Sequence, residues 1–280
     1  MPQSRFFHLH LVSDATGETL NAVARAAAAQ YSDHRPVEHI YALVRTAKQL
    51  HRVLSEVEQQ PGVVLFTIID PAIRRQLEAK CAELSIPCIS ILDPVIASLG
   101  HYLNARHQPQ VGRQHVMNEE YFKRIDALNY TMAHDDGQHP EGLDHAEVVL
   151  VGISRTSKTP TSIYLANRGV MVANIPLVPD QPYPLELDSV QKPLVVGLVA
   201  TAERIAQIRK HRLLGLNENR ETDYVDHQKI SAELMHMRKL CARKNWPLID
   251  VTRRSIEETS AAILNLMSDR NREQERGDGP

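Results

Sequence analysis

Glu147-Val-Val-Leu-Val151 is an apolar run of β type, and it leads directly into Gly152-Ile-Ser-Arg-Thr-Ser-Lys158-Thr159. The second segment has the spacing of a Walker A loop, and Pro160-Thr-Ser-Ile-Tyr-Leu-Ala166 continues it as a helix. A strand, a loop and a helix in this order place backbone N–H groups, a lysine and a hydroxyl around a polyphosphate. Ser157 departs from the pattern, because a second glycine is usual at its position. The stretch predicts α/β structure and suggests a nucleotide site.

Each residue type in the loop suits a task in phosphate binding. Gly152 is expected to turn the chain out of the strand with a positive φ, and the amides that follow can form a nest for phosphate oxygens. Lys158 and Arg155 are cations that can offset the charge of a transferring phosphoryl group. Thr159 is expected to ligate Mg²⁺ through its hydroxyl. The alternative is an ordinary turn between strand and helix, which Ser157 favours because its Cβ narrows the conformations open to the loop.

The composition is that of a globular protein, with 42% hydrophobic and 24% charged residues in a chain of 280. A formal net charge of -2 argues against nucleic acid as the main partner. No apolar run approaches the ~20 residues of a membrane span, and Met1-Pro-Gln-Ser-Arg-Phe6 lacks the apolar core of a signal peptide. We therefore expect a cytoplasmic protein with no membrane partner.

The cysteines and histidines indicate neither disulfides nor a metal site. Cys81, Cys88 and Cys241 form no C-x-x-C pair and suit a reducing compartment, so we interpret them as small buried apolar residues. The 14 histidines are dispersed and lack the spacing with which zinc ligands follow one another on a helix.

Strand and helix signals alternate along the chain, which predicts mostly parallel, doubly wound sheets. We expect an N-terminal α/β domain over residues 1–133 and a P-loop-like nucleotide-binding domain over residues 134–268. Residues 269–280 contain no apolar side chain and are expected to be a disordered tail. A helical stretch with an interruption around Gln108–Gly112 is expected before residue 133. The expected strands are Phe6–Val12, Val37–Val44, Val63–Ile69, Cys88–Leu92, Val148–Val151, Val170–Ile175, Leu194–Val199 and Leu248–Val251.

Ser13-Asp-Ala-Thr-Gly-Glu-Thr19 follows the first strand, at the edge where ligands of open α/β sheets bind. Gly17 permits a turn there, and the hydroxyls of Ser13, Thr16 and Thr19 can hold an anion. An equal alternative is that Thr16 caps the helix that follows.

Two further groups of polar residues are candidates for the same chemistry. Asp135 and Asp136 precede the Val148 strand and can hold Mg²⁺ or deprotonate a hydroxyl, although Asp-Asp-Gly is also good turn chemistry. Asp250 can reach the ligand edge from the last strand. Arg253 and Arg254 follow it and are more often a solvated face than a phosphate site.

Over nearly its whole length the chain resembles the pyruvate, phosphate/water dikinase regulatory proteins, which are bifunctional serine/threonine kinases and phosphorylases. The resemblance is carried by Ser13–Thr19, by Tyr130-Thr-Met-Ala-His-Asp-Asp-Gly137 and above all by the long motif Ala146–Ala166. It continues in Ala173-Asn-Ile-Pro176 and in Trp246-Pro-Leu-Ile-Asp-Val-Thr-Arg-Arg-Ser-Ile-Glu-Glu-Thr259. A serine before the lysine is usual in this family, so Ser157 favours the assignment.

The resemblance implies an unusual chemistry. Members of the family move the β-phosphate of ADP to a threonine of the dikinase and release AMP, which switches the dikinase off. They reverse the switch by phosphorolysis, in which inorganic phosphate attacks the phosphothreonine and pyrophosphate leaves. By the same resemblance, the ADP-binding loop is formed by Gly152, Ile153, Ser154, Arg155, Thr156, Ser157, Lys158 and Thr159.

One cationic site can serve both directions, because each reaction passes a phosphoryl group between oxygen nucleophiles. Our hypothesis is that Lys158 and Arg155 stabilise the transferring phosphoryl group. Asp135 or Asp136 would assist the threonine hydroxyl or bind Mg²⁺.

The expected partner is pyruvate, phosphate dikinase, because Arg155-Thr-Ser-Lys-Thr159 and Ile249-Asp-Val-Thr-Arg-Arg254 look more like that subfamily. Phosphoenolpyruvate synthase, the water dikinase, is the alternative target. The rivals from other classes are an ATP-dependent P-loop kinase of a small molecule and a non-enzymatic nucleotide sensor. The oligomeric state stays open, with a homodimer as one alternative.

Overall fold

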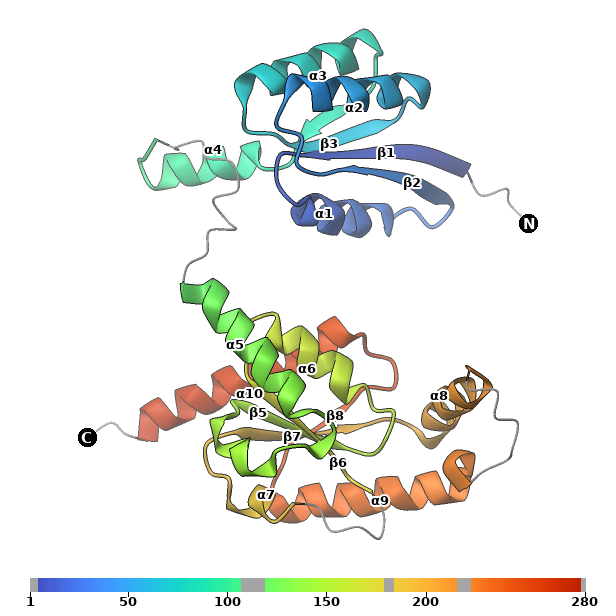
Figure 1. Cartoon of the computed structure of the whole chain (residues 1–280), viewed down its shortest axis with the longest axis vertical. Coiled ribbons are helices and arrows are strands. Elements are labelled where there is room, and N and C mark those ends of the chain that lie inside the picture. Colours follow the sequence, from blue (N-terminus) through green and yellow to red (C-terminus); the bar gives the residue numbers. More distant parts are fainter. Residues whose placement is uncertain (1–4, 107–118, 179–183, 216–222, 278–280) are drawn as a thin grey trace. The chain divides into compact units, whose positions relative to one another are not determined.

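The chain divides into two compact units, residues 1–116 and residues 117–280. The computed structural model describes residues 5–106, 119–178, 184–215 and 223–277. Each unit is built on one parallel four-stranded sheet with helices packed against it (Figure 1). The predicted α/β fold class is therefore confirmed.

The first unit is a doubly wound sheet with the strand order β2-β1-β3-β4. Leu20 and Ala24 of helix α1 pack on one face of this sheet against Leu9, Leu11 and Leu65. Helices α2 and α3 cover the opposite face, as Figure 1 shows. The elements are β1 (Arg5–Ser13), α1 (Glu18–Ala28), β2 (His34–Tyr41), α2 (Ala47–Gln59), β3 (Val63–Thr67), α3 (Pro71–Glu83), β4 (Cys88–Ser90) and α4 (Asp93–Tyr102).

Local sequence signals determine where α2 and α3 begin. Thr46 and Gln49 form a capping box, in which the Thr46 hydroxyl accepts from Gln49 N at 3.3 Å and Gln49 Oε1 accepts from Thr46 N at 3.0 Å. Asp70 caps α3 by accepting from Ala72 N at 2.8 Å, and Pro71 stands at the first helical position. These bonds satisfy amides that would otherwise lack a partner within the helix.

The second unit has the strand order β6-β5-β7-β8, again all parallel. Short turns at Asp135–Gly137, Pro140–His145 and Asp223–Val225 connect its larger elements. These are α5 (Glu119–Ala133), β5 (Val148–Gly152), α6 (Lys158–Ala166), β6 (Val172–Pro176), α7 (Glu186–Ser189), β7 (Leu194–Val199), α8 (Ala202–Gly215), α9 (His227–Lys244), β8 (Leu248–Asp250) and α10 (Ile256–Gly277).

Strand β5 lies in the middle of this unit, and all five of its residues are buried. Val149 and Val151 belong to the core beneath α7, α8 and α9, whereas Val148 and Leu150 pack on the other face with α6 and α10. The chain leaves β5 to form β6 on one side and later forms β7 on the other. The point where strand order reverses therefore lies between β5 and β7, and ligands of such sheets bind at the carboxyl ends of the strands there.

Two boundaries differ from the sequence prediction. The second unit begins before residue 119, so α5 belongs to it rather than to the first domain, and the Thr131 hydroxyl accepts from Val172 N of β6 at 3.1 Å. Helix α10 continues to Gly277, so residues 269–277 are helical and not disordered. Residues 278–280 and the expected interruption at Gln108–Gly112 lie outside the described residues. No helix within the described residues is long and apolar enough to cross a membrane.

Candidate active site

The loop between β5 and α6 has an unusual backbone. Arg155 and Ser157 both adopt left-handed conformations, with φ of 77° and 59°. A left-handed backbone conformation in a non-glycine residue costs of order 1–3 kcal/mol of folding free energy. It persists only where the surrounding structure holds the residue in place. Ser157 thus takes up the conformation for which glycine is usually chosen, and it occupies the N-cap of α6 without a side-chain capping bond. The first amides of α6 therefore remain open to an anion.

Gly152 is required by space rather than by backbone conformation. It does not have the positive φ that the sequence suggests. A Cβ at this position would stand 2.7 Å from Thr156 Oγ1 and 2.8 Å from the carbonyl oxygen of Leu198 on the neighbouring strand β7. The glycine therefore lets the loop pass close to the reversal point of the sheet.

Lys158 is buried at the first turn of α6, with 7% of its surface exposed. Its Nζ donates to the carbonyl oxygens of Gly152 at 2.9 Å and Ile153 at 3.1 Å. Burial lowers the pKa of Lys158 to about 8, against the opposing effect of Asp136 and Asp135. The ammonium group therefore stands inside the loop with two weak partners, where a phosphate would be a stronger one.

The other predicted loop residues divide by the direction of their side chains. Ile153 is 1% exposed and lies in the core, and the buried Thr156 hydroxyl donates to Ile153 O at 3.0 Å. These two residues can offer a ligand only their backbone amides. Ser154 and Arg155 stand at the crest of the loop, where both contact the hydroxyl of Tyr224.

The structure brings two of the predicted site residues, Asp135 and Thr159, into contact. The Thr159 hydroxyl donates to Asp135 Oδ1 at 3.1 Å. Asn174 completes the group, since its Nδ2 donates both to Asp135 and, at 3.0 Å, to Thr159 Oγ1. Asn174 is 2% exposed, and its Oδ1 has no hydrogen-bond partner among the described residues. Sequence reasoning gave Asn174 no role in the site, although it lies in Ala173–Pro176, one of the stretches that carry the family resemblance.

The segment that carries the aspartates is fixed against β6. The carbonyl of His134 accepts from Asn174 N at 2.9 Å, and the His134 ring stacks on Tyr130 with centroids 3.8 Å apart. Asp136 follows in a left-handed conformation with φ 55°. Its charge raises the pKa of Lys158, so it acts on the same group as Asp135. Both aspartates therefore act electrostatically on Lys158, and Asp135 is the one bonded to Thr159.

The last strand does not supply a free carboxylate. Asp250 Oδ1 accepts from Thr252 N at 2.8 Å and from the Thr252 hydroxyl, and these bonds lower the pKa of Asp250. Thr252 Oγ1 in turn accepts from Thr201 N at 3.0 Å. Asp250 therefore joins the ends of β7 and β8, and the exposed Arg253 and Arg254 are solvated.

In the segment Ser13–Thr19 of the first unit, the side chains of Ser13 and Asp14 are bonded to residues at the end of β3. Ser13 Oγ accepts from the Thr67 hydroxyl at 2.9 Å, and Asp14 Oδ2 accepts from Ile69 N at 2.7 Å. Gly17, with φ 83°, is the N-cap of α1. The N-cap position that one interpretation of the sequence gives to Thr16 is therefore held by the glycine.

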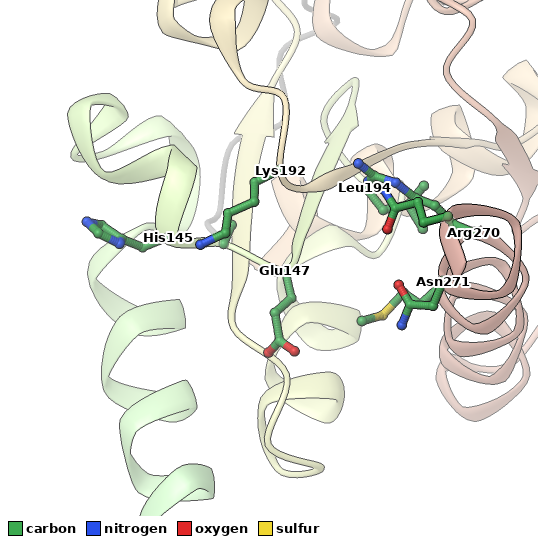
Figure 2. A pocket seen from close by; sticks show the side chains of 9 residues that line it. His145, Glu147, Lys192, Leu194, Arg270 and Asn271 are labelled. Atoms are coloured by element: carbon green, nitrogen blue, oxygen red, sulfur yellow. The ribbon is translucent and has the colours of Figure 1, made fainter. Parts of the chain in front are cut away.

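A pocket of about 200 Å³ lies at the opposite, amino-terminal edge of the second sheet (Figure 2). Part of its polar lining is already engaged: Glu147 accepts from Met171 N at 2.9 Å and Arg270 donates to Gln191 O at 2.9 Å. This pocket is not part of the candidate site.

Within the described residues no three His, Cys, Asp or Glu side chains are grouped to hold a metal ion. The three cysteines are free, as predicted, with Cys81 and Cys241 buried and Cys88 partly buried.

The fold and the site define a parallel α/β protein whose cations and carboxylates meet at one strand-to-helix loop. The family model described as Kinase/pyrophosphorylase matches residues 9–264, and the chain belongs to this family.

Relatives match over most of their length. A protein of Bradyrhizobium diazoefficiens is 59% identical over 274 residues, covering 97% of this chain and 98% of that protein. One from Chelativorans sp. (strain BNC1) is 58% identical over 265 residues, covering 95% and 97%. One from Caulobacter vibrioides is 56% identical over 263 residues, covering 94% and 84%. Each of them is named "Putative pyruvate, phosphate dikinase regulatory protein".

Proposed function

We propose that this protein is a bifunctional regulator of pyruvate, phosphate dikinase. In one direction it transfers the β-phosphate of ADP to a threonine hydroxyl of the dikinase, which yields phosphothreonine, AMP and a proton. In the other direction inorganic phosphate attacks the phosphothreonine, so that the hydroxyl is restored and pyrophosphate is released. The names of the relatives support the choice of target, and the family description supports a kinase with a second, pyrophosphate-linked activity.

The observation that carries the proposal is the buried Lys158 beneath an uncapped helix start. Both reactions spread negative charge over a phosphoryl group in transit, and fixed positive groups stabilise that charge. We expect the Lys158 ammonium to exchange its bonds to the Gly152 and Ile153 carbonyls for bonds to the phosphate. Arg155 adds a second positive charge at the crest of the same loop. The phosphoryl donor and acceptor differ between the two reactions, but the transferred phosphoryl group is the same. One loop that stabilises this group can therefore serve both directions.

Thr159 and Asp135 fit a magnesium ion, because a hydroxyl and a carboxylate are the oxygen ligands that Mg²⁺ prefers. The distance between Thr159 Oγ1 and Asp135 Oδ1 is 3.1 Å, and Asn174 donates hydrogen bonds to both residues. A bound ion would neutralise charge on the phosphates. Asp136 is then left to orient or deprotonate the threonine hydroxyl, a task that needs a carboxylate near the phosphoryl group. Free cysteines suit the cytoplasm, which we take as the site of action.

The test is to incubate the protein with ADP and purified pyruvate, phosphate dikinase and to analyse the dikinase by mass spectrometry. We expect one phosphorylated threonine, formed with ADP and not with ATP, and its loss with pyrophosphate formation when phosphate is supplied. The same incubation with phosphoenolpyruvate synthase in place of the dikinase tests the alternative target. Phosphorylation of the synthase alone would overturn the target, and absence of phosphothreonine from both dikinases would overturn the function.

A further inference from the structure

Tyr224 touches the candidate loop from a distant part of the second unit. It lies in the turn Asp223–Val225 that precedes α9, and its hydroxyl oxygen is 3.1 Å from Ser154 Oγ. Arg155 Nε donates to the same oxygen, also at 3.1 Å. One phenol thus bonds two consecutive residues at the crest of the loop, and none of the motifs in the sequence includes it.

The ring of Tyr224 is held in turn by Arg209 of α8. The guanidinium carbon lies 4.6 Å from the ring centroid, and Arg209 NH1 donates to the Tyr224 carbonyl at 3.1 Å. Arg209 is 2% exposed and pairs with Glu233 of α9 at 2.7 Å. Breaking a buried ion pair of this kind is costly, because each charge would lose its partner in a medium of low polarity. Tyr224 therefore cannot shift without disturbing the packing of α8 on α9.

The same contacts explain how Arg155 keeps its strained backbone. A left-handed φ of 77° persists in a non-glycine residue only when neighbouring structure over-determines it. Arg155 is tied through its side chain to Tyr224, and the carbonyl of the preceding Ser154 accepts from Arg209 NH2 at 3.4 Å. Burial raises the pKa of Tyr224, but the bonds with Ser154 and Arg155 and the charges of Arg155 and Arg209 together outweigh it and leave the pKa lowered.

We propose that Tyr224 is a positioning residue for phosphoryl transfer: its hydroxyl holds Ser154 and Arg155 so that the Arg155 guanidinium is in place before nucleotide binds. The proposal rests on the function proposed above and concerns the same loop. Tyr224 acts through Arg155 and does not itself touch the phosphoryl group. Because both directions of transfer use Arg155, loss of the hydroxyl should impair both.

Tyr224→Phe is the discriminating variant, since it removes one oxygen and leaves the ring over Arg209. We expect kcat to fall about tenfold in both directions, the effect of losing a hydrogen bond to a charged group. Arg155→Ala and the double variant Tyr224→Phe/Arg155→Ala should have equal rates, because in the proposal the hydroxyl affects the rate only by placing the Arg155 guanidinium. Tyr164→Phe on α6 is the matched control, because it removes a hydroxyl that also accepts from an arginine, Arg168 NH2 at 2.7 Å. Its rates should equal those of the wild type.

Hydrogen exchange of the amides of residues 153–157 gives a second readout that needs no activity. We expect about tenfold faster exchange in full-length Tyr224→Phe and wild-type exchange in Tyr164→Phe. Wild-type kcat in Tyr224→Phe, a further fall in the double variant below Arg155→Ala, or unchanged exchange would each overturn the proposal. A wild-type protein that phosphorylates neither dikinase would instead overturn the proposed function, and the exchange result would still decide whether Tyr224 holds the loop.

Discussion

The protonation state of a single residue, Lys158, sets the charge at the centre of the candidate site. Its ammonium group is buried, and its pKa is lowered to about 8, so the protonated form is in the majority only below that pH. A polyphosphate favours the protonated form, and binding it must raise the pKa and take up a proton. The affinity for ADP should therefore weaken as pH rises through and above about 8.

We expect the Kd for ADP to increase by up to about tenfold per pH unit above this value, because only the charged form binds well. Isothermal titration calorimetry between about pH 7 and about pH 9.5 measures this dependence. Lys158→Ala should bind more weakly and show a flat profile. A slope that survives in Lys158→Ala would assign the titration to another group.

Strand β6 contributes one side chain, Asn174, to the candidate site. Its amide donates to Asp135 and Thr159, while its Oδ1 is buried without a partner among the described residues. An apolar side chain of similar shape should therefore cost little stability, since the replaced group was incompletely satisfied. The strand would keep its packing, and the carboxylate would lose the donor that orients it.

We predict that Asn174→Leu lowers the rate of ADP-dependent phosphorylation by roughly 10- to 100-fold, as loss of an orienting bond to a ligand does. The free energy of unfolding should change by no more than about 1 kcal/mol in a urea titration. Asn167→Leu, an exposed amide at the end of α6, is the matched control and should retain full activity. Wild-type rates in Asn174→Leu would show that Asp135 needs no support from β6.

Strands β1 and β2 of the first unit form a stack of imidazoles. His10 and His39 are paired in the register of the two strands, and their ring centroids are 4.6 Å apart. The distance between His8 Nδ1 and His39 Nε2 is 2.9 Å. His10 is fully buried, with its ring between Tyr41 OH and the Gln60 carbonyl. Burial lowers the pKa of His10, and charge on His39 or His8 would lower it further, while the Gln60 bond and Glu56 oppose this effect.

The folded unit thus resists protonation that the unfolded chain accepts near pH 6.5, the ordinary value for histidine. Stability should fall as pH drops below roughly 6.5, by up to about 1.4 kcal/mol per unit until the lowered pKa is passed. Urea titrations from about pH 8 to about pH 5 test this expectation. His10→Leu should be less stable at about pH 8 but have a flatter profile, whereas exposed His101→Gln on α4 should keep the slope. An equal slope in His10→Leu would contradict the assignment.

At the scale of the whole molecule, patterns that are local in sequence were predictable and contacts between distant segments were not. The βα alternation predicts both parallel sheets, and the loop before Thr159 marks the candidate site, because strand, loop and helix are contiguous. Tyr224 reaches the candidate loop only through packing, which no single stretch reveals, and the motif that contains Asn174 does not show that its amide bonds Asp135 and Thr159. Residues 269–277 lack apolar side chains, but they are rich in arginine, glutamate and glutamine, which favour a helix, and they extend one that has begun at Ile256. Helix α5 joins the second unit because Ala127 and Thr131 are buried there.

The central claim is that one loop transfers the phosphoryl group in both directions. It is tested most directly in Lys158→Ala, assayed for ADP-dependent phosphorylation of pyruvate, phosphate dikinase and for phosphate-dependent dephosphorylation of the phosphorylated dikinase. Lys192→Ala, an exposed lysine at the other edge of the sheet, is the matched control. We predict that both activities fall by at least about 100-fold in Lys158→Ala and that neither falls in the control. Loss of the kinase with the phosphorylase fully intact would contradict a shared site.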